Sequence, residues 1–203
     1  ILIRAEGRGF CGGVDIKEMQ AHPERITILN RGNYLTFKAI RDAEIPVVSA
    51  VHKFVIGGGI GICGASDTII ASDDAFFSLP EVDRGAMGGG AHLQRLFPVQ
   101  KVRYMYFTGE MIDAAEAYRL GAVERVVPRA QLRAAAREIA VKIAAKSPAM
   151  ISLAKEALNG IEDGNLEDKY RGEQGFTLEA YSTKDSQEAR DAFVQKRDAK
   201  FTG

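Results

Sequence analysis

The sequence predicts an α/β fold in which a glycine-rich, layered core is followed by a helical segment. Short apolar runs at 1–5, 47–51 and 68–72 are typical of buried strands, and helix-like stretches lie between them. A further apolar run at 123–128 ends at Pro128 and predicts one more strand. Strands and helices that alternate in this way favour a layered α/β core.

The remainder of the chain is predicted to be helical. Apolar residues recur at helical spacing along one face, at Leu132, Ala136, Ile139 and Ile143. Ser147 precedes a proline and is a suitable N-cap for the next helix. We therefore divide the chain into an α/β core over 1–145 and a C-terminal helical segment over 146–203.

The composition excludes several classes of function. The 203 residues include 27 basic and 27 acidic residues, so no net charge favours nucleic acid or an anionic membrane as partner. No apolar run approaches the ~20 residues of a membrane span, and the opening residues do not resemble a signal peptide. Cys11 and Cys63 make neither a disulfide framework nor a metal cluster. We expect a cytoplasmic protein without a metal.

Two glycine-rich turns each follow a strand-like run. They read "GRGFCGGVDIKEM" over 7–19 and "IGGGIG" over 56–61. The second turn has neither the spacing of a dinucleotide fingerprint nor the G-K-[ST] of a P-loop. Each is either an ordinary strand-to-helix turn or a place where the backbone approaches a ligand closely. Two such turns can direct one N–H each at the same oxygen, as in an oxyanion hole.

Titratable side chains follow in "FSLPEVDRGAMGGGAHLQRL", over 77–96. Glu81 stands at the end of a strand-like run and is a candidate general acid or base. An isolated glutamate is as well explained as a helix cap or a surface residue. His92 is either a second titrating group or a polar residue at a helix start.

Taken together, these segments resemble the crotonase (enoyl-CoA hydratase/isomerase) superfamily. The resemblance rests on an ordered set of segments, "FCGGVDIKEM", "PVVSAVHKFVIGGGIGI", "SDTIIASDDAFFSLPEVDRG", "LFPVQKVRYMYFTGEMIDAAEAYRLGAVERVVP" and "AFVQKRDAKF". It covers essentially the whole chain, whereas the family's opening strand–strand–helix segment has no counterpart in this sequence. It implies a spiral of ββα units with C-terminal helices that pack trimers, often paired into hexamers.

The resemblance also implies a coenzyme A thioester as substrate, with no prosthetic group. The backbone N–H groups of Val14 and Gly58 would hold the thioester oxygen as it becomes an enolate. Cys11, Val14 and Ile16 belong to the turn that would flank the adenine and pantetheine of CoA. The acyl pocket would be built partly by a variable loop around 20–33 and partly by the C-terminal helices.

The segment "AFVQKR" contributes to the CoA site in this family, often that of a neighbouring subunit. It contains Phe193 and Lys196. Lys196 suits a CoA phosphate by its charge. An exposed surface lysine without a ligand is an equally good interpretation.

Typical hydratases of the family use two glutamates to position water and move protons. The second corresponds to Glu81, but the first corresponds to Gly61, and glycine transfers no proton. This departure argues against two-glutamate hydration. One glutamate suffices for Δ3,Δ2-enoyl isomerisation, in which a single base moves one proton, and it leaves room for a bulkier substrate.

A finer resemblance concerns an actinobacterial subgroup that hydrolyses a C–C bond in an alicyclic diketo acyl-CoA during steroid-ring breakdown. It rests on "GGGIGI", "LPEVDRGA", His92 and "YRGEQGFT" over 170–177. Here His92 would handle water or a proton. We therefore expect an acyl-CoA enzyme with Glu81 as its acid/base, and this C–C hydrolase as an alternative. A non-catalytic CoA-ester-binding protein is the alternative of another class.

Overall fold

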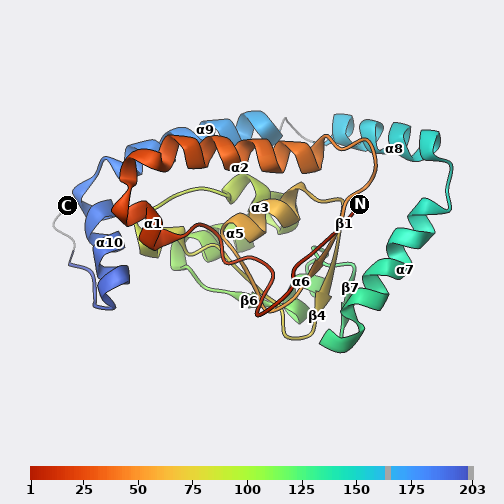
Figure 1. Ribbon diagram of the computed structural model, residues 1–203, viewed down its shortest axis with the longest axis horizontal. Coiled ribbons are helices and arrows are strands. Elements are labelled where there is room, and N and C mark those ends of the chain that lie inside the picture. Colours follow the sequence, from red (N-terminus) through yellow and green to blue (C-terminus); the bar gives the residue numbers. More distant parts are fainter. Residues whose placement is uncertain (163–165, 201–203) are drawn as a thin grey trace.

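The computed structural model describes residues 1–162 and 166–200, whose strands form two small sheets surrounded by helices (Figure 1). The larger sheet is parallel and has the order β1 (Leu2–Arg4), β2 (Val48–Val51), β4 (Thr68–Ser72) and β7 (Arg125–Val127). The smaller sheet has the order β3 (Phe54–Ile56), β5 (Phe76–Ser78) and β6 (Ile112–Asp113), with β6 antiparallel to β5. The four runs predicted as strands are those of the larger sheet.

From β2 to β5, successive strands alternate between the two sheets. The chain passes from β2 to β3 and then into α3 (Gly58–Ala65). It next passes from β4 to β5 and on to the helices that follow, η2 (Glu81–Arg84), α4 (Gly90–Leu96) and α5 (Val99–Thr108). This repetition confirms the predicted α/β class and its spiral of strand–strand–helix units.

The other helices cover the core. They are α1 (Ile16–Ala21), η1 (Pro23–Arg25), α2 (Ile26–Arg41), α6 (Ala114–Arg119), η3 (Arg129–Gln131), α7 (Leu132–Ala144), α8 (Pro148–Ile161), α9 (Leu166–Tyr181) and α10 (Lys184–Gln195). Figure 1 shows α2 alongside α9 at the top, with α1 and α10 at one end and α7 and α8 at the other. None of the described helices is long and apolar enough to cross a membrane.

Two predictions about the helices have different outcomes. The C-terminal helices are present, and the Ser147 hydroxyl caps α8 by accepting a hydrogen bond from the N–H of Met150 at 3.5 Å. The predicted loop around 20–33 is wrong, because α2 already begins at Ile26. The turn between α7 and α8 contains the predicted boundary at 145, and the division into two domains stays a prediction.

The hydrophobic core has three parts. The largest lies around the smaller sheet and α3 to α6, and its fully buried members include Val51, Val55, Ile60, Phe77, Leu93 and Met105. A second part packs α7 against the larger sheet. A third part, below α2 and α9, contains Phe37, Ala65 and Tyr170. This third part lies behind the functional site.

Two glycines of α3 allow its neighbours to approach closely. A Cβ atom placed on Gly64 would lie 2.5 Å from Cβ of His92 in α4. A Cβ atom placed on Gly61 would overlap the ring of Phe37 in α2. Any larger residue at either position would push these helices apart. α3 is therefore enclosed by α2 and α4, and only its N-terminal end is left free for a ligand.

Candidate active site

The structure brings the two glycine turns together. Residues 10 and 11 run beside β3, where Cys11 N–H donates to the carbonyl of Phe54 at 3.1 Å and Ile56 N–H donates to the carbonyl of Cys11 at 2.9 Å. A Cβ atom placed on Gly13 would lie only 3.3 Å from the backbone nitrogen of Gly58. Gly13 and Gly57 have positive φ angles of 84° and 55°, which favour glycine. The two turns are thus in contact.

This contact places two backbone donors at one cavity. Val14 and Gly58 both line it, and no described residue accepts a hydrogen bond from either N–H. Gly58 is the first residue of α3, and the N–H groups of a first turn have no acceptor within their helix. Two free donors on adjacent turns have the arrangement that binds a developing oxyanion.

The carboxylate of Glu81 lies against the same turn. Glu81 begins η2, shortly after β5, and its side chain lines the cavity. Its Oε1 is 2.8 Å from the position that a Cβ atom on Gly57 would occupy. A side chain at position 57 would therefore collide with the carboxylate as well as strain the backbone. The arrangement puts an acid/base group next to the candidate oxyanion hole.

The cavity itself has a volume of about 480 Å³. One wall is a single face of α2, formed by Ile26, Leu29, Asn30, Asn33 and Phe37. The C-terminal helices α9 and α10 supply further lining residues, Tyr170, Thr177, Tyr181 and Phe193. Such a mostly apolar cavity with a few polar groups is typical of a small-molecule site. The described residues contain no group of three or more His, Cys, Asp or Glu side chains that could hold a metal ion.

Comparison with known proteins now identifies the family. The family model described as enoyl-CoA hydratase/isomerase matches residues 1–203. The chain belongs to the enoyl-CoA hydratase/isomerase family. It is an enzyme of that family.

Three relatives illustrate the likeness. Two are named "(7aS)-7a-methyl-1,5-dioxo-2,3,5,6,7,7a-hexahydro-1H-indene-carboxyl-CoA hydrolase", from Rhodococcus jostii and Mycobacterium tuberculosis. Both are 49% identical to this chain, over 96% and 97% of it and over 76% and 80% of their own lengths. The crystal structure of an enoyl-CoA hydratase/isomerase from Xanthobacter autotrophicus Py2 has a TM-score of 0.87 at 25% identity. That match covers 100% of this chain and 81% of the other.

The predicted residue His92 does not line the cavity. Its ring is buried between Phe37 and Tyr170, with ring centroids 4.7 and 4.9 Å away. Burial, together with the positive charges of Arg95 and Arg41, lowers the pKa of His92 to about 4. His92 is therefore neutral at neutral pH, and it stands behind two aromatic residues that do line the cavity.

The residues expected to contact CoA fall into two groups. Val14, Ile16 and Phe193 line the cavity. Cys11 and Lys196 are not among its lining residues. The Cys11 backbone instead holds β3, and Lys196 is exposed at the end of α10.

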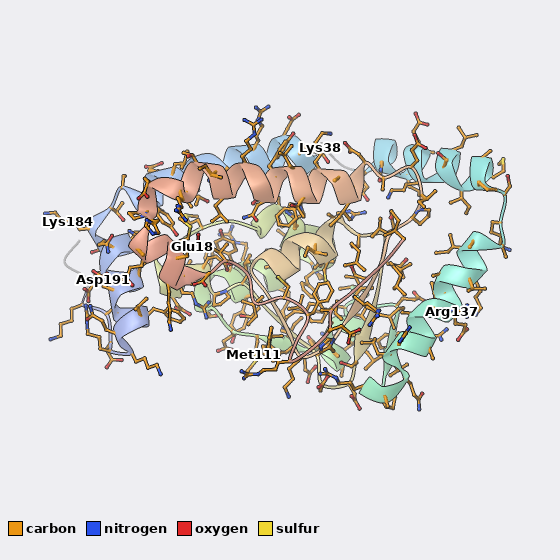
Figure 2. The ribbon with its side chains drawn as sticks, viewed as in Figure 1. Glu18, Lys38, Met111, Arg137, Lys184 and Asp191 are labelled. Carbon is orange, nitrogen blue, oxygen red and sulfur yellow. The ribbon has the colours of Figure 1, made fainter. Side chains whose placement is uncertain are left out.

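α10 is attached directly to the segment that carries Glu81. The hydroxyl of Ser186 donates to the carbonyl of Gly85, the residue that ends η2. The guanidinium of Arg84 stands 4.8 Å from the centroid of the Phe193 ring. Gln20 Nε2 of α1 donates to Asp191 Oδ1 of α10 at 2.8 Å. Figure 2 labels Glu18 on α1 and Asp191 on α10 at the same end of the molecule.

Sequence reasoning missed the wall formed by α2. Asn30 and Asn33 fall in the span that was predicted to be a loop. The signal was available, because Ile26, Leu29, Asn30, Asn33 and Phe37 follow helical spacing. The polar residues at the centre of this face interrupted the apolar pattern.

Proposed function

We propose that this chain hydrolyses a carbon–carbon bond in an alicyclic diketo acyl-CoA. The N–H groups of Val14 and Gly58 bind the thioester oxygen, and Glu81 moves the proton. Two relatives that are 49% identical to this chain are named as hydrolases of a bicyclic dioxo carboxyl-CoA, which supports this substrate class. The carbon–carbon bond as the bond cleaved follows from the resemblance to the steroid-ring subgroup. An acyl-CoA substrate suffices for this chemistry without a prosthetic group.

One observation carries the choice of reaction. The Phe37 ring fills the space that any side chain at Gly61 would need. The resemblance places the first glutamate of the hydratases at this position. The site thus has no room for a carboxylate at position 61, and we assign the proton transfer to Glu81. Hydration that depends on two positioned carboxylates is disfavoured.

A single carboxylate can support each step of the hydrolysis. Glu81 takes a proton from water as the water oxygen bonds to the carbon of a ring ketone adjacent to Cα. The tetrahedral adduct collapses, the bond between that carbon and Cα breaks, and its electron pair forms the thioester enolate. Glu81 then returns the proton to Cα. The products are a ring-opened carboxylic acid and an intact CoA thioester, so one water is consumed.

The reaction is tested by offering two substrates to the purified protein. A bicyclic diketo acyl-CoA should gain one water with loss of a ring bond, as followed by mass spectrometry and NMR. A linear trans-2-enoyl-CoA should be a poor substrate. Faster hydration of the linear ester would instead indicate a hydratase. Migration of a double bond in a 3-enoyl-CoA would indicate an isomerase.

The non-catalytic alternative has its own outcome. It predicts binding of a CoA ester without turnover and without solvent deuterium exchange at Cα. Glu81 next to the glycine turn argues against it, because binding alone needs no such acid.

The proposal includes an assembly and a location. Cys11, Val14, Ile16, Phe193 and Lys196 would contact CoA, the last two in the same or a neighbouring subunit of a homotrimer or a dimer of trimers. Exposed apolar side chains on α8, including Met150 and Leu153, are available for such contacts. Light scattering would give the oligomeric state. We expect the enzyme in the cytoplasm, where both thiols stay reduced.

A further inference from the structure

Two side-chain amides interrupt the apolar wall that α2 presents to the cavity. Asn30 and Asn33 both line the cavity and are both half-buried. They stand between Leu29 and Phe37 on the same face of the helix. An acyl group made only of hydrocarbon would gain nothing from them, whereas an oxygen atom in the acyl group would.

The packing of α2 on α3 places these amides opposite the candidate oxyanion hole. Phe37 covers Gly61, which does not line the cavity. Asn33 on α2 and Gly58 on α3 lie one turn N-terminal to this contact on their helices. Both residues line the cavity. Asn30 follows one turn further along α2. The carboxamides and the Gly58 N–H therefore belong to facing walls of one cavity.

Asn30 carries a buried donor without a partner. Its Nδ2 is inaccessible to solvent and makes no hydrogen bond to any described residue. The backbone carbonyl of the same residue accepts a hydrogen bond from Gln174 Nε2 at 2.5 Å, which fixes this turn of α2 against α9. Leaving such a donor unpaired costs stability. Because Asn30 lines the cavity, rotation of its carboxamide brings Nδ2 to the cavity wall, where a ligand oxygen can pair with it.

We propose that Asn30 and Asn33 form a second oxyanion site, which binds the oxygen of the ring ketone under attack. This inference rests on the proposed function, because hydrolysis of a C–C bond develops negative charge twice. The thioester enolate requires the N–H groups of Val14 and Gly58. The tetrahedral adduct carries its charge on the former ketone oxygen, and it requires separate donors on the other side of the substrate.

Uncharged amides suit this role. When water adds to the ketone, its C=O π electrons move to the oxygen, and the amide N–H groups stabilise that oxyanion. When the adduct collapses, the C=O bond re-forms as part of a carboxyl group, and the electron pair of the broken C–C bond passes to Cα. Each amide supplies up to two N–H donors and no charge. A cation at the same place would instead weaken Glu81 as a base.

The test measures two reactions of the same variants. Ring opening of the bicyclic diketo acyl-CoA needs both oxyanion sites. Deuterium exchange at Cα of butyryl-CoA needs only Val14, Gly58 and Glu81. For Asn30→Ala and Asn33→Ala we expect kcat for ring opening to fall by ~10² each, with the exchange rate within about twofold of the parent protein. Arg31→Ala, an exposed neighbour on α2, is the matched control and should change neither rate.

Each outcome decides the matter. Loss of ring opening with retained exchange supports the second oxyanion site. Near-normal ring opening in the double variant Asn30→Ala/Asn33→Ala, or equal loss of ring opening and exchange, overturns the second oxyanion site. Retained exchange also shows that a variant has folded. If the parent protein performs neither reaction, the proposed function itself fails, which is distinguishable from failure of the amide assignment.

Discussion

The ring of Phe37 occupies the space into which a side chain at Gly61 would extend, although the two residues lie on different helices. This relationship gives a direct prediction for Gly61→Glu. The new side chain must displace Phe37, and overpacking of this kind costs ~1–3 kcal/mol. Urea unfolding should therefore show a lower free energy of unfolding.

The same substitution elsewhere provides the control for Gly61→Glu. Gly32 is exposed on α2, with nothing within 4 Å of its Cβ position. Gly32→Glu should leave stability equal or slightly higher, because glycine within a helix is unfavourable. Because Phe37 and position 61 are in contact, the double variant Phe37→Ala/Gly61→Glu should lose less stability than the sum of the two single losses. An unchanged unfolding curve for Gly61→Glu alone would contradict the close contact.

Replacement of Glu81 separates proton transfer from binding. Glu81→Gln keeps the size of the side chain next to Gly57 but removes the base, so we expect kcat to fall by ~10²–10⁴. The dissociation constant of a CoA ester, measured by calorimetry, should remain within a few-fold. Asp83→Asn, in the same turn but outside the cavity lining, is the matched control. Full turnover by Glu81→Gln would assign the proton to another group.

The buried ring of His92 makes stability depend on pH. The pKa of His92 is lowered to about 4 in the folded protein, while an unfolded histidine titrates near ~6.5. Between these values the unfolded chain binds a proton that the folded chain does not. The contribution of neutral His92 to the free energy of unfolding should therefore be fully present above pH ~6.5. It should be lost as the pH decreases toward 4, which lowers the free energy of unfolding by up to about 3 kcal/mol.

Urea unfolding at pH 5 and pH 7.5 tests this dependence on His92. The variant His92→Phe keeps an aromatic ring between Phe37 and Tyr170 but cannot titrate, so its stability should differ less between the two pH values. His22→Gln, at an exposed position, should retain the full dependence. An equal slope for His92→Phe and the parent protein would show that other groups are responsible.

A buried ion pair joins α8 to the core. Lys155 Nζ donates to Asp67 Oδ2 at 2.9 Å, and the Lys155 side chain is only 5% exposed. Lys155→Met would leave the carboxylate of Asp67 without its cation. Because the Asp67 side chain is 23% exposed and also accepts a hydrogen bond from Val47 N–H, we expect a cost below the ~3–5 kcal/mol of a fully buried pair. The thermal midpoint should fall by several degrees. Lys142→Met, which breaks an exposed pair with Glu138, should change it little.

The sequence predicts the strands of the core better than the wall that α2 forms in the candidate active site. The strands at 47–51 and 68–72 are visible because their residues are apolar and buried on both faces of a parallel sheet. Glu81 and the two glycine turns follow from residue type. A helix-like stretch near 34–42 already indicates the second half of α2. The first half of α2 escapes notice because a helix that lines a cavity carries amides where a core helix carries apolar residues.

Contacts between residues that are far apart in the sequence likewise cannot be predicted from local sequence patterns. Nothing in the spacing of residues 37 and 61 shows that they touch, and nothing near His92 shows that aromatic rings separate it from the cavity. Both relationships arise from the packing of α2, α4 and α9 around α3. The contact of Gly13 with Gly58 depends in the same way on the pairing of residues 10 and 11 with β3.

The attachment of α10 to Gly85 has a consequence for how the enzyme is made. Glu81 belongs to the first half of the chain, but the segment that carries it is held by Ser186, and Phe193 closes the same cavity. A ribosome releases the first half before it has synthesised these residues. The site is therefore completed only after residue 193 has been synthesised, so a nascent chain that already contains Glu81 and both glycine turns is still inactive before that point.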